Sequence, residues 1–409
     1  VPRGYVWNYL AMFTNPSLEG QRPLLDSVVT VGELLQEVGY RTAIIGKWGL
    51  GAPGTEGVPN RQGFDFFFGY NCQRQAHTLY PLHLWKNEER VLLRNDTVPP
   101  HTRLSEGADP NDPASYAAFQ QEEYAPARMQ EEVISFIDRH QEQPFFLYYA
   151  TPIPHLPLQA PSHWVDYYRE QLGPEEPYTG ENGYFPSQYP RATYAAMISY
   201  LDEQVGQLVD TLKALGLYEN TLILFSSDNG PTFTGGADTP FFDSGGPFRC
   251  EQGWGKGSVH EGGIRVPMIA SWPGRIVPGS TSDHRSAFYD VLPTLCEAAG
   301  RTVPVPTDGL SFLPTLTGQG EQPEHDFLYW EFPAYGGQQA VRMGPWKGMR
   351  RNMQEGNLEI ELYNLETDVR EEQDVAAEHP EVVARIRAIM AQEQLPPAIE
   401  RFRIAALEK

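Results

Sequence analysis

The sequence predicts an α/β fold in which a mostly parallel β-sheet lies between helices. Three apolar runs of strand length, at residues 42–45, 145–150 and 221–226, predict buried strands. Apolar residues recur every three to four positions at residues 125–140 and 191–215, which predicts helices between those strands. Because strands that alternate with helices are joined by crossover connections, the sheet should be largely parallel and covered on both faces.

The first helix and the first strand have clear limits in the sequence. Residues 30–38 carry apolar side chains at helical spacing, and Gly39 follows where a left-handed C-cap would end the helix. The run at residues 42–45 then leads into a glycine-dense turn at residues 46–51. A strand followed by a polar turn recurs at the other two predicted strands.

The pattern changes from about His325 onward. Short apolar segments lie close together and are followed by one helical stretch near residues 380–394. Closely spaced strands followed by a helix indicate a smaller domain built from an antiparallel sheet and a helix. We therefore expect a larger domain at residues 1–322 and a small C-terminal α+β domain at residues 323–409.

Composition excludes several classes of protein. The 31 basic and 53 acidic side chains give a formal charge of −22, which opposes binding to a nucleic-acid backbone. With 40% hydrophobic residues, the chain has enough apolar surface to fold. No apolar run approaches the roughly 18–20 residues that cross a bilayer, so we expect no membrane span. The start at Val1 shows no signal-like pattern, and we interpret it as an internal cut.

Polar turns follow the three predicted strands. They contain Lys47, His155 and the pair Asp228–Asn229. In a parallel sheet, ligands bind where the carboxyl ends of the strands meet. We therefore predict one composite site at that edge of the sheet.

Asp228 and Asn229 are candidate metal ligands. A carboxylate and an amide carbonyl directly after a strand supply hard oxygens at a fixed place, which suits Ca²⁺ or Mg²⁺. Ca²⁺ takes about 6–8 oxygen ligands, so these two residues provide only part of a shell. Asp-Asn-Gly is also good turn chemistry, and the pair taken alone fits a simple turn equally well.

Three further side chains are candidates for anion binding and proton transfer. Lys47 and Lys256 each stand in glycine-rich sequence, which lets the backbone approach a ligand closely. In a chain this acidic, lysines placed in such loops are expected to hold an anion. His155 stands among prolines, and an imidazole with an ordinary pKa of about 6.5 suits proton transfer to a leaving oxygen. Taken singly, each also fits a plain role, as a solvated lysine or a hydrogen-bonding histidine.

Four segments in order resemble the signature segments of type I sulfatases, in the alkaline phosphatase superfamily. They are residues 39–51 with Lys47, 151–157 with His155, 225–230 with Asp228–Asn229, and 256–267 with Lys256. Residues 362–380 also resemble the end of the family's small domain. The resemblance runs from near residue 3 to about residue 390, and four ordered motifs are more specific than any one of them.

The resemblance implies hydrolysis of sulfate esters. In the family, the hydrate of a post-translationally formed formylglycine attacks sulfur while Ca²⁺ and basic side chains hold the sulfate oxygens. By motif, Asp228 and Asn229 would ligate the metal, for which Ca²⁺ is favoured over Mg²⁺. Lys47 and Lys256 would neutralise sulfate charge, and His155 would protonate the departing alcohol. Fixed positive charge is what a transition state that develops negative charge requires.

Two departures from the family pattern concern the catalytic residues. Many relatives have a histidine two residues after the motif lysine, where this chain has Gly49, and we interpret His77 as its replacement at the substrate. A plain loop histidine is the alternative. We expect the family's nucleophile motif, a Cys or Ser followed by x-Pro-x-Arg, to be missing from the chain. None of Cys72, Cys250 and Cys296 fits it, and none has the spacing of a metal or redox site. We expect these cysteines to be buried.

The family's upstream Asp-Asp pair is also missing from the sequence, so we expect an N-terminally truncated sulfatase whose nucleophile segment lies before Val1. That segment should include formylglycine, a strand of the sheet and half of the metal ligands. We expect the 409-residue chain to be inactive, because loss of a nucleophile costs orders of magnitude in rate. Turnover of an aryl sulfate by this chain would contradict that expectation.

Three functions stay open at this point. A sulfuric ester hydrolase is favoured, a phosphomonoester or phosphonate hydrolase of the same superfamily would reuse the metal cradle, and a non-catalytic binder of sulfated ligands would keep only the lysines. Family habit favours sulfated glycans as substrates and a periplasmic or secreted location. Trp85, Trp164 and Tyr184 fit stacking on a sugar and fit packing equally well. The sequence gives no indication of oligomeric state.

Overall fold

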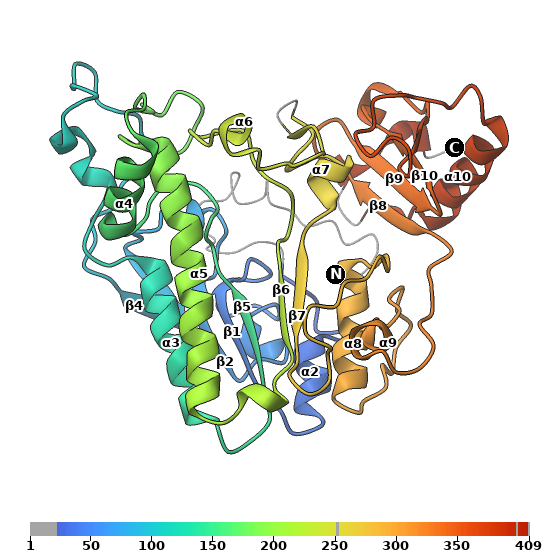
Figure 1. The fold of residues 1–409 in the computed structure, drawn as a ribbon, viewed down its shortest axis with the longest axis horizontal. Helices are drawn as coiled ribbons and strands as arrows, with labels where there is room; N and C mark the ends of the chain where they lie inside the picture. The colour runs from blue at the N-terminus through green and yellow to red at the C-terminus, as the bar shows by residue number, and fades with distance from the viewer. Residues whose placement is uncertain (1–22, 251–252, 398–399, 408–409) are drawn as a thin grey trace.

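The protein is described here by a computed structural model, which covers residues 23–250, 253–397 and 400–407 (Figure 1). A central sheet with its helices forms the larger part. A second sheet with one long helix, α10, lies at one side, at the upper right of Figure 1. The opening segment at Val1 lies outside the described residues.

The central sheet has five strands in the order β4–β3–β2–β1–β5. β1 (Arg41–Lys47) pairs in parallel with β2 (Phe66–Tyr70) and with β5 (Phe145–Ala150). β3 (His83–Lys86) and β4 (Glu89–Leu92) extend the sheet beyond β2 with antiparallel pairing. The α/β prediction is confirmed, and the sheet is mixed because a hairpin, absent from the prediction, adds its antiparallel edge.

Helices form where the periodicity predicted them. Thr30 caps α2 (Val31–Gln36) in a reciprocal capping box with Glu33, which satisfies two backbone donors of the first turn. α3 (Ala125–Arg139) and α5 (Pro190–Ala214) follow the two predicted helical stretches closely. The shorter helices are α4 (Ser162–Leu172), α6 (Thr239–Phe242), α7 (Glu261–Ile264), α8 (Val291–Ala298) and α9 (Leu313–Thr317).

The two faces of the central sheet are buried differently. On one face, Ala43 and Ile45 of β1 pack with Phe136 of α3 in the largest cluster of buried side chains. On the other face, Ile44 packs with aromatic side chains, among them Trp48 and residues of β2 and β3. This alternation along β1 is that of a strand buried on both sides, which explains why it reads as a continuous apolar run.

One predicted strand joins a different sheet. β6 (Ile223–Ser226) pairs antiparallel with β7 (Met268–Ser271) in a two-stranded sheet, so the expectation that it extends the parallel sheet is wrong for the described residues. An apolar run predicts that a strand forms but carries no information on its neighbour. Tyr148 of β5 is 53% exposed and Ile269 of β7 is 63% exposed, so both strands have faces that the described residues leave uncovered.

The C-terminal part agrees with its prediction. β8 (Leu328–Phe332), β9 (Gln338–Met343), β10 (Trp346–Arg350) and β11 (Glu361–Asn364) form an antiparallel sheet in the order β11–β10–β9–β8. α10 (Pro380–Glu393) covers it with apolar side chains of one face. The boundary at residues 322/323 stays a prediction.

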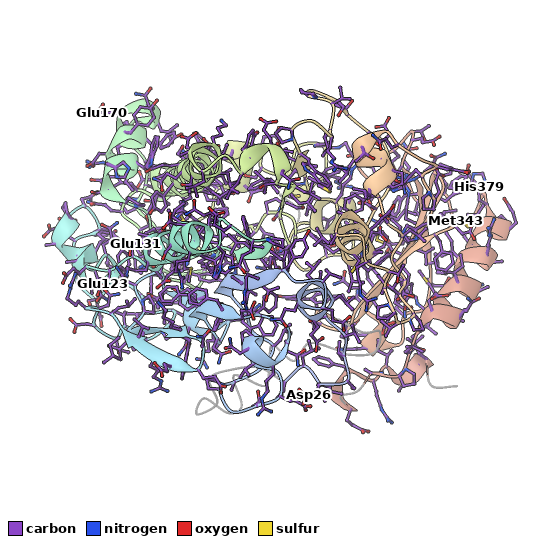
Figure 2. The ribbon with its side chains drawn as sticks, turned by 90° about the horizontal axis from the view of Figure 1, so that it is seen from below. Asp26, Glu123, Glu131, Glu170, Met343 and His379 are labelled. Carbon is purple, nitrogen blue, oxygen red and sulfur yellow. The ribbon has the colours of Figure 1, made fainter. Side chains whose placement is uncertain are left out.

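The surface is acidic, as the net charge requires. Asp26, Glu131 and Glu170 point outward in Figure 2, and all three are exposed. Across the described residues, no helix combines the length and the apolar character that crossing a bilayer demands. The three cysteines are buried, as predicted, and form no disulfide among the described residues.

Gly46, directly before Lys47, is required for the contact between β1 and β5. Its φ is +126°, and a Cβ there would lie 2.0 Å from the carbonyl oxygen of Ala150. We expect Gly46→Ala to lower the free energy of unfolding by more than about 3 kcal/mol, because the strands would have to separate.

Gly39→Ala is the matched control for this prediction. Gly39 also has a positive φ, of +87°, but a Cβ there would meet nothing within 4 Å. Its cost should be about 1–2 kcal/mol, from the backbone conformation alone. Urea unfolding of both variants measures the difference, and equal losses would show that the close approach at Gly46 is unimportant.

Candidate functional site

The parallel pairing brings three strand ends to one edge of the central sheet. Gly46 of β1 is level with Gly69 of β2 and with Ala150 of β5. Lys47 therefore lies beside the segments that leave β2 and β5, which carry His77 and His155. β6 is followed by Asp228 and Asn229, two and three residues after its end.

Lys47 lies in a charged and partly buried environment. Burial and the nearby Lys256 ammonium lower the pKa of Lys47 to about 8, and the Asp228 carboxylate partly offsets them. Because charge–charge interactions weaken with distance, these influences indicate that Lys47, Lys256 and Asp228 lie near one another. Two ammonium groups beside a single carboxylate give this region a net positive charge that can attract an anion.

Lys256 reaches the same positively charged region from a loop. The Lys256 backbone N–H donates to the carbonyl of Pro231 at 2.9 Å, which ties the loop to the segment after Asn229. The side chain is exposed to solvent, yet partial burial lowers its pKa, and Asp228 opposes this shift. Lys256 is thus the more accessible of the two cations.

Asp228 and Asn229 fit part of a metal shell. They present one carboxylate and one amide oxygen, the hard donors that Ca²⁺ and Mg²⁺ take. The described residues hold no group of three or more His, Cys, Asp or Glu side chains able to bind a metal ion. The two residues therefore supply a minority of the roughly 6–8 oxygens that Ca²⁺ binds.

His155 is oriented by its own backbone. Its Nδ1 lies 2.7 Å from the carbonyl oxygen of Leu156, and because a carbonyl only accepts, Nδ1 carries the hydrogen and Nε2 the lone pair. Burial, followed by Lys47 and Lys256, keeps the pKa of His155 well below its usual value. Without a bound anion the ring is therefore neutral at neutral pH.

His77 is buried and lies against His155. The two ring centroids are 5.7 Å apart, and His77 also contacts His101 at 5.5 Å and Tyr184 at 5.1 Å. We call His77, His101, His155 and Tyr184 the ring cluster. Burial and neighbouring cationic groups, first His101 and Lys47, lower the pKa of His77 to about 3. The buried Nδ1 of His77 has no hydrogen-bond partner among the described residues.

Two members of the ring cluster have unusual backbones. His101 has φ +63° and Tyr184 has φ +62°, and the Tyr184 N–H donates to Nδ1 of His101 at 2.8 Å. Non-glycine residues in the left-handed region concentrate at functional sites. Sequence reasoning missed His101, because no local motif surrounds it.

The other two aromatic candidates serve packing. Trp85 is buried in the core beneath the central sheet, and Trp164 packs beside α5 with its indole N–H donating to Glu203 at 2.8 Å. Tyr184 alone of the three predicted aromatic residues lies in the ring cluster.

One serine matches the nucleophile pattern that we expected to be missing from the chain. Ser271-Trp272-Pro273-Gly274-Arg275 reads Ser-x-Pro-x-Arg, so that expectation is wrong at the level of sequence. Ser271 pairs with Ile223 at the start of β6, whereas Asp228 follows the end of β6. Strand register therefore puts Ser271 at the far end of this two-stranded sheet from the candidate site.

Two protein-family models match the chain. The model described as Sulfatase matches residues 8–301. The model described as N-sulphoglucosamine sulphohydrolase, C-terminal, matches residues 250–395.

Known proteins with similar sequences or structures point the same way. The chain is 33% identical to human arylsulfatase A over 362 residues, covering 81% of this chain and 60% of that protein. It is 28% identical to human N-acetylgalactosamine-6-sulfatase, covering 81% and 57%. The crystal structure of Ps i-CgsB in complex with k-i-k-neocarrahexaose is 25% identical with a TM-score of 0.70, covering 93% of this chain and 80% of that one. The chain thus spans less than two thirds of the length of these two human relatives.

Sulfate binding should weaken as the pH rises through about 8, because Lys47 then loses its proton. Below that pH the ammonium is charged and binds the anion, and above it each pH unit removes up to about tenfold of the charged form. Isothermal titration calorimetry with inorganic sulfate at constant ionic strength measures this dependence. Lys47→Met should bind more weakly and without the transition near pH 8.

Lys86→Met is the control for this prediction. Lys86 pairs with Glu132 at 2.7 Å on the antiparallel side of the sheet. Its removal should leave both the affinity and its pH dependence intact. Unchanged sulfate affinity of the unaltered chain up to about pH 10 would contradict the role of Lys47.

Proposed function

Because this chain belongs to the sulfatase family, we propose that the protein hydrolyses sulfate esters. The observation that carries the proposal is the convergence of Lys47 and Lys256 with His155 beside Asp228. A sulfate group is tetrahedral and anionic, and its charge grows on the bridging oxygen as the ester bond breaks. Fixed cations at that point stabilise the transition state.

Lys47 and Lys256 would hold the sulfate oxygens, and His155 would deliver a proton to the departing alcohol. In the absence of a bound anion, the depressed pKa of His155 opposes that role. A neutral ring whose Nδ1–H is bonded to the Leu156 carbonyl has no proton to give from Nε2. A bound sulfate would offset the two lysine charges that lower the pKa. Proton uptake at Nε2 would then accompany substrate binding.

Asp228 and Asn229 would bind Ca²⁺, or less favourably Mg²⁺, as part of its oxygen shell. The ion would act as a Lewis acid that withdraws charge from a sulfate oxygen. Their position beside both lysines supports this assignment. His77 would contact the substrate through its buried Nδ1, which has no partner among the described residues.

The nucleophile would be formylglycine, whose precursor we propose lies outside residues 1–409. The cysteines do not fit the motif, and Ser271 fits the motif at the wrong end of its strand. The 409-residue chain should then bind sulfate without turning over esters.

Sulfated glycans are the substrate class that we propose. The ring cluster continues from His155 to the exposed His101, and imidazole and phenol rings provide flat faces on which a sugar ring packs. One relative is named an N-acetylgalactosamine-6-sulfatase, and one structural neighbour was solved with a neocarrahexaose. Tyr184→Ala should therefore raise KM for a sulfated oligosaccharide more than for a simple aryl sulfate.

Kinetics on matched esters test the reaction class. In the protein expressed from its natural coding sequence, Lys256→Met should lower kcat/KM for 4-nitrophenyl sulfate by about 10²–10³-fold, because it removes one charge from the transition state. Ser271→Ala should leave kcat/KM unchanged. Faster turnover of 4-nitrophenyl phosphate would favour the phosphomonoesterase of the same superfamily. If the protein expressed from its natural coding sequence binds sulfate but turns over no ester, a non-catalytic binder would be favoured.

Sulfate should also raise the pKa of His155. NMR titration of the histidine ring signals of the 409-residue chain, with and without inorganic sulfate, measures this shift. The signals of His163, which lies on α4, should not respond. A His155 titration that is unaffected by saturating sulfate would contradict its role as the proton donor.

A further inference from the structure

We propose that the C-terminal sheet takes part in the active centre by holding Lys256 in place, with Gln338 and Lys347 as positioning residues. The inference rests on the proposed role of Lys256 in binding sulfate. It assigns a function to Gln338 and Lys347, two residues that lie outside the four motifs that carry the family resemblance.

Gln338 of β9 holds the residues directly after Lys256. Its side chain is only 4% exposed. The amide Nε2 donates to the carbonyl of Gly257 at 2.9 Å, and the Val259 N–H donates to Oε1 at 3.2 Å. One buried amide thus satisfies a donor and an acceptor of the loop, which would otherwise lose their partners on burial.

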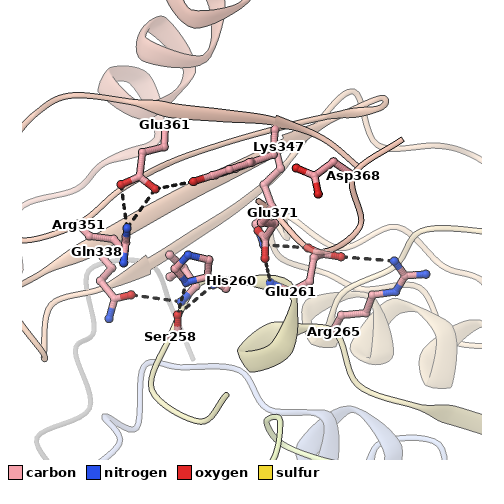
Figure 3. Close-up of polar contacts among 12 residues, drawn as sticks. Ser258, His260, Glu261, Arg265, Gln338, Lys347, Arg351, Glu361, Asp368 and Glu371 are labelled. Carbon is pink, nitrogen blue, oxygen red and sulfur yellow. Dashed lines mark hydrogen bonds and ion pairs between the residues drawn. The ribbon is translucent and has the colours of Figure 1, made fainter. Parts of the chain in front are cut away.

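Lys347 of β10 fixes the next turn of the same loop (Figure 3). Its side chain is fully buried, and Nζ lies 2.8 Å from carboxylate oxygens of both Glu261 and Glu371. Glu371 also accepts from the Glu261 backbone N–H at 2.8 Å. Glu261, at the start of α7, is therefore held twice: Lys347 binds its side chain, and Glu371 accepts from its backbone N–H.

The charges make this attachment hard to displace. Burial alone would raise the pKa of Glu261, but Lys347, together with Arg342 and Arg265, outweighs it and the pKa is lowered. Burial raises the pKa of Glu371, and Lys347 opposes that shift. Moving the loop would separate Glu261 from the buried Lys347 ammonium and leave it only Glu371, and breaking a buried ion pair is far costlier than losing a surface one.

The opposite side of the loop contacts Gly230 and Pro231, which follow the candidate metal ligands in the chain. Lys256 donates to Pro231, and the Gly230 N–H donates to the carbonyl of Gly263 at 3.0 Å. A Cβ on Gly255 would lie 2.2 Å from the Pro231 oxygen, so the two segments touch. The loop at residues 255–263 is therefore held between the segment that follows Asp228–Asn229 and the C-terminal sheet.

Such support is needed because Lys256 is exposed and repelled by Lys47. An unrestrained lysine would turn toward water. Misplacement of a charged group by about 1 Å can cost on the order of 10²-fold in rate. The clamp formed by Gln338, Lys347 and Glu371 keeps the backbone next to Lys256 in one position.

A double-mutant cycle on sulfate binding tests the inference in the 409-residue chain. Gln338→Met should weaken the Kd for inorganic sulfate by about 3- to 10-fold, since it removes two hydrogen bonds to the loop. In a Lys256→Met background the same substitution should have no further effect. A merely structural role would give equal losses in both backgrounds and would overturn the inference.

Gln322→Met is the matched control. Gln322 also accepts from a backbone N–H, of Thr315 at 3.0 Å, and donates to a carbonyl, of Ser311 at 2.8 Å, but lies away from the Lys256 loop. The Gln322→Met variant should have a lower Tm and an unchanged affinity for sulfate. Because Lys347→Met alone removes a buried charge, we would use the triple variant Glu261→Gln, Lys347→Met and Glu371→Gln, which should weaken sulfate binding at least as much as Gln338→Met.

Hydrogen exchange separates this inference from the proposed function. Amides at residues 257–261 should exchange faster in Gln338→Met than in Gln322→Met, whether or not sulfate binds. Failure of the unaltered chain to bind sulfate would contradict the proposed function, and exchange would still decide whether the sheet holds the loop. Unchanged exchange, or unchanged sulfate affinity in Gln338→Met while Lys256→Met binds weakly, would overturn the inference.

Discussion

Two ammonium groups lie near each other in the candidate site, and their mutual repulsion has to be overcome by the structure around them. Lys256 lowers the pKa of Lys47, and only Asp228 opposes the two charges. A protein can keep like charges together only if the backbones that carry them cannot relax apart. One lysine stands at the end of a central strand, and the other stands in a loop attached on two sides.

The same charges determine the state of the histidines. Burial, with Lys47 and Lys256, depresses the pKa values of His77 and His155, so both rings are neutral when no anion is bound. Neutral imidazoles add hydrogen-bonding capacity without adding repulsion. The chain as a whole carries a formal charge of −22, so attraction for an anion depends on a local excess of positive charge such as this one. A local cluster of cations on an acidic protein favours small anions that can contact both ammonium groups.

Sequence reasoning found what local patterns encode and missed what long-range pairing decides. Lys47 and His155 could be predicted because each follows an apolar run, and parallel pairing then brings strand ends together. The partner of β6 could not be predicted, since apolar character does not specify a neighbour. Ser271 shows the converse case, in which a motif matches in sequence and strand register removes it from the site. His101 and Lys347 carry no local signal at all.

Lys347 explains why a buried charge is worth keeping in such a fold. A lysine within a strand would ordinarily be read as solvated, because lysine is almost never fully buried unless it is paired. Its partner Glu261 is 86 residues away in the sequence, so the pair exists only in the folded chain. Buried ion pairs add little net stability compared with apolar packing, but breaking one costs about 3–5 kcal/mol. The arrangement therefore holds the loop in place, which the proposed sulfate-binding role of Lys256 requires, and on that proposal the C-terminal sheet is a structural part of the site.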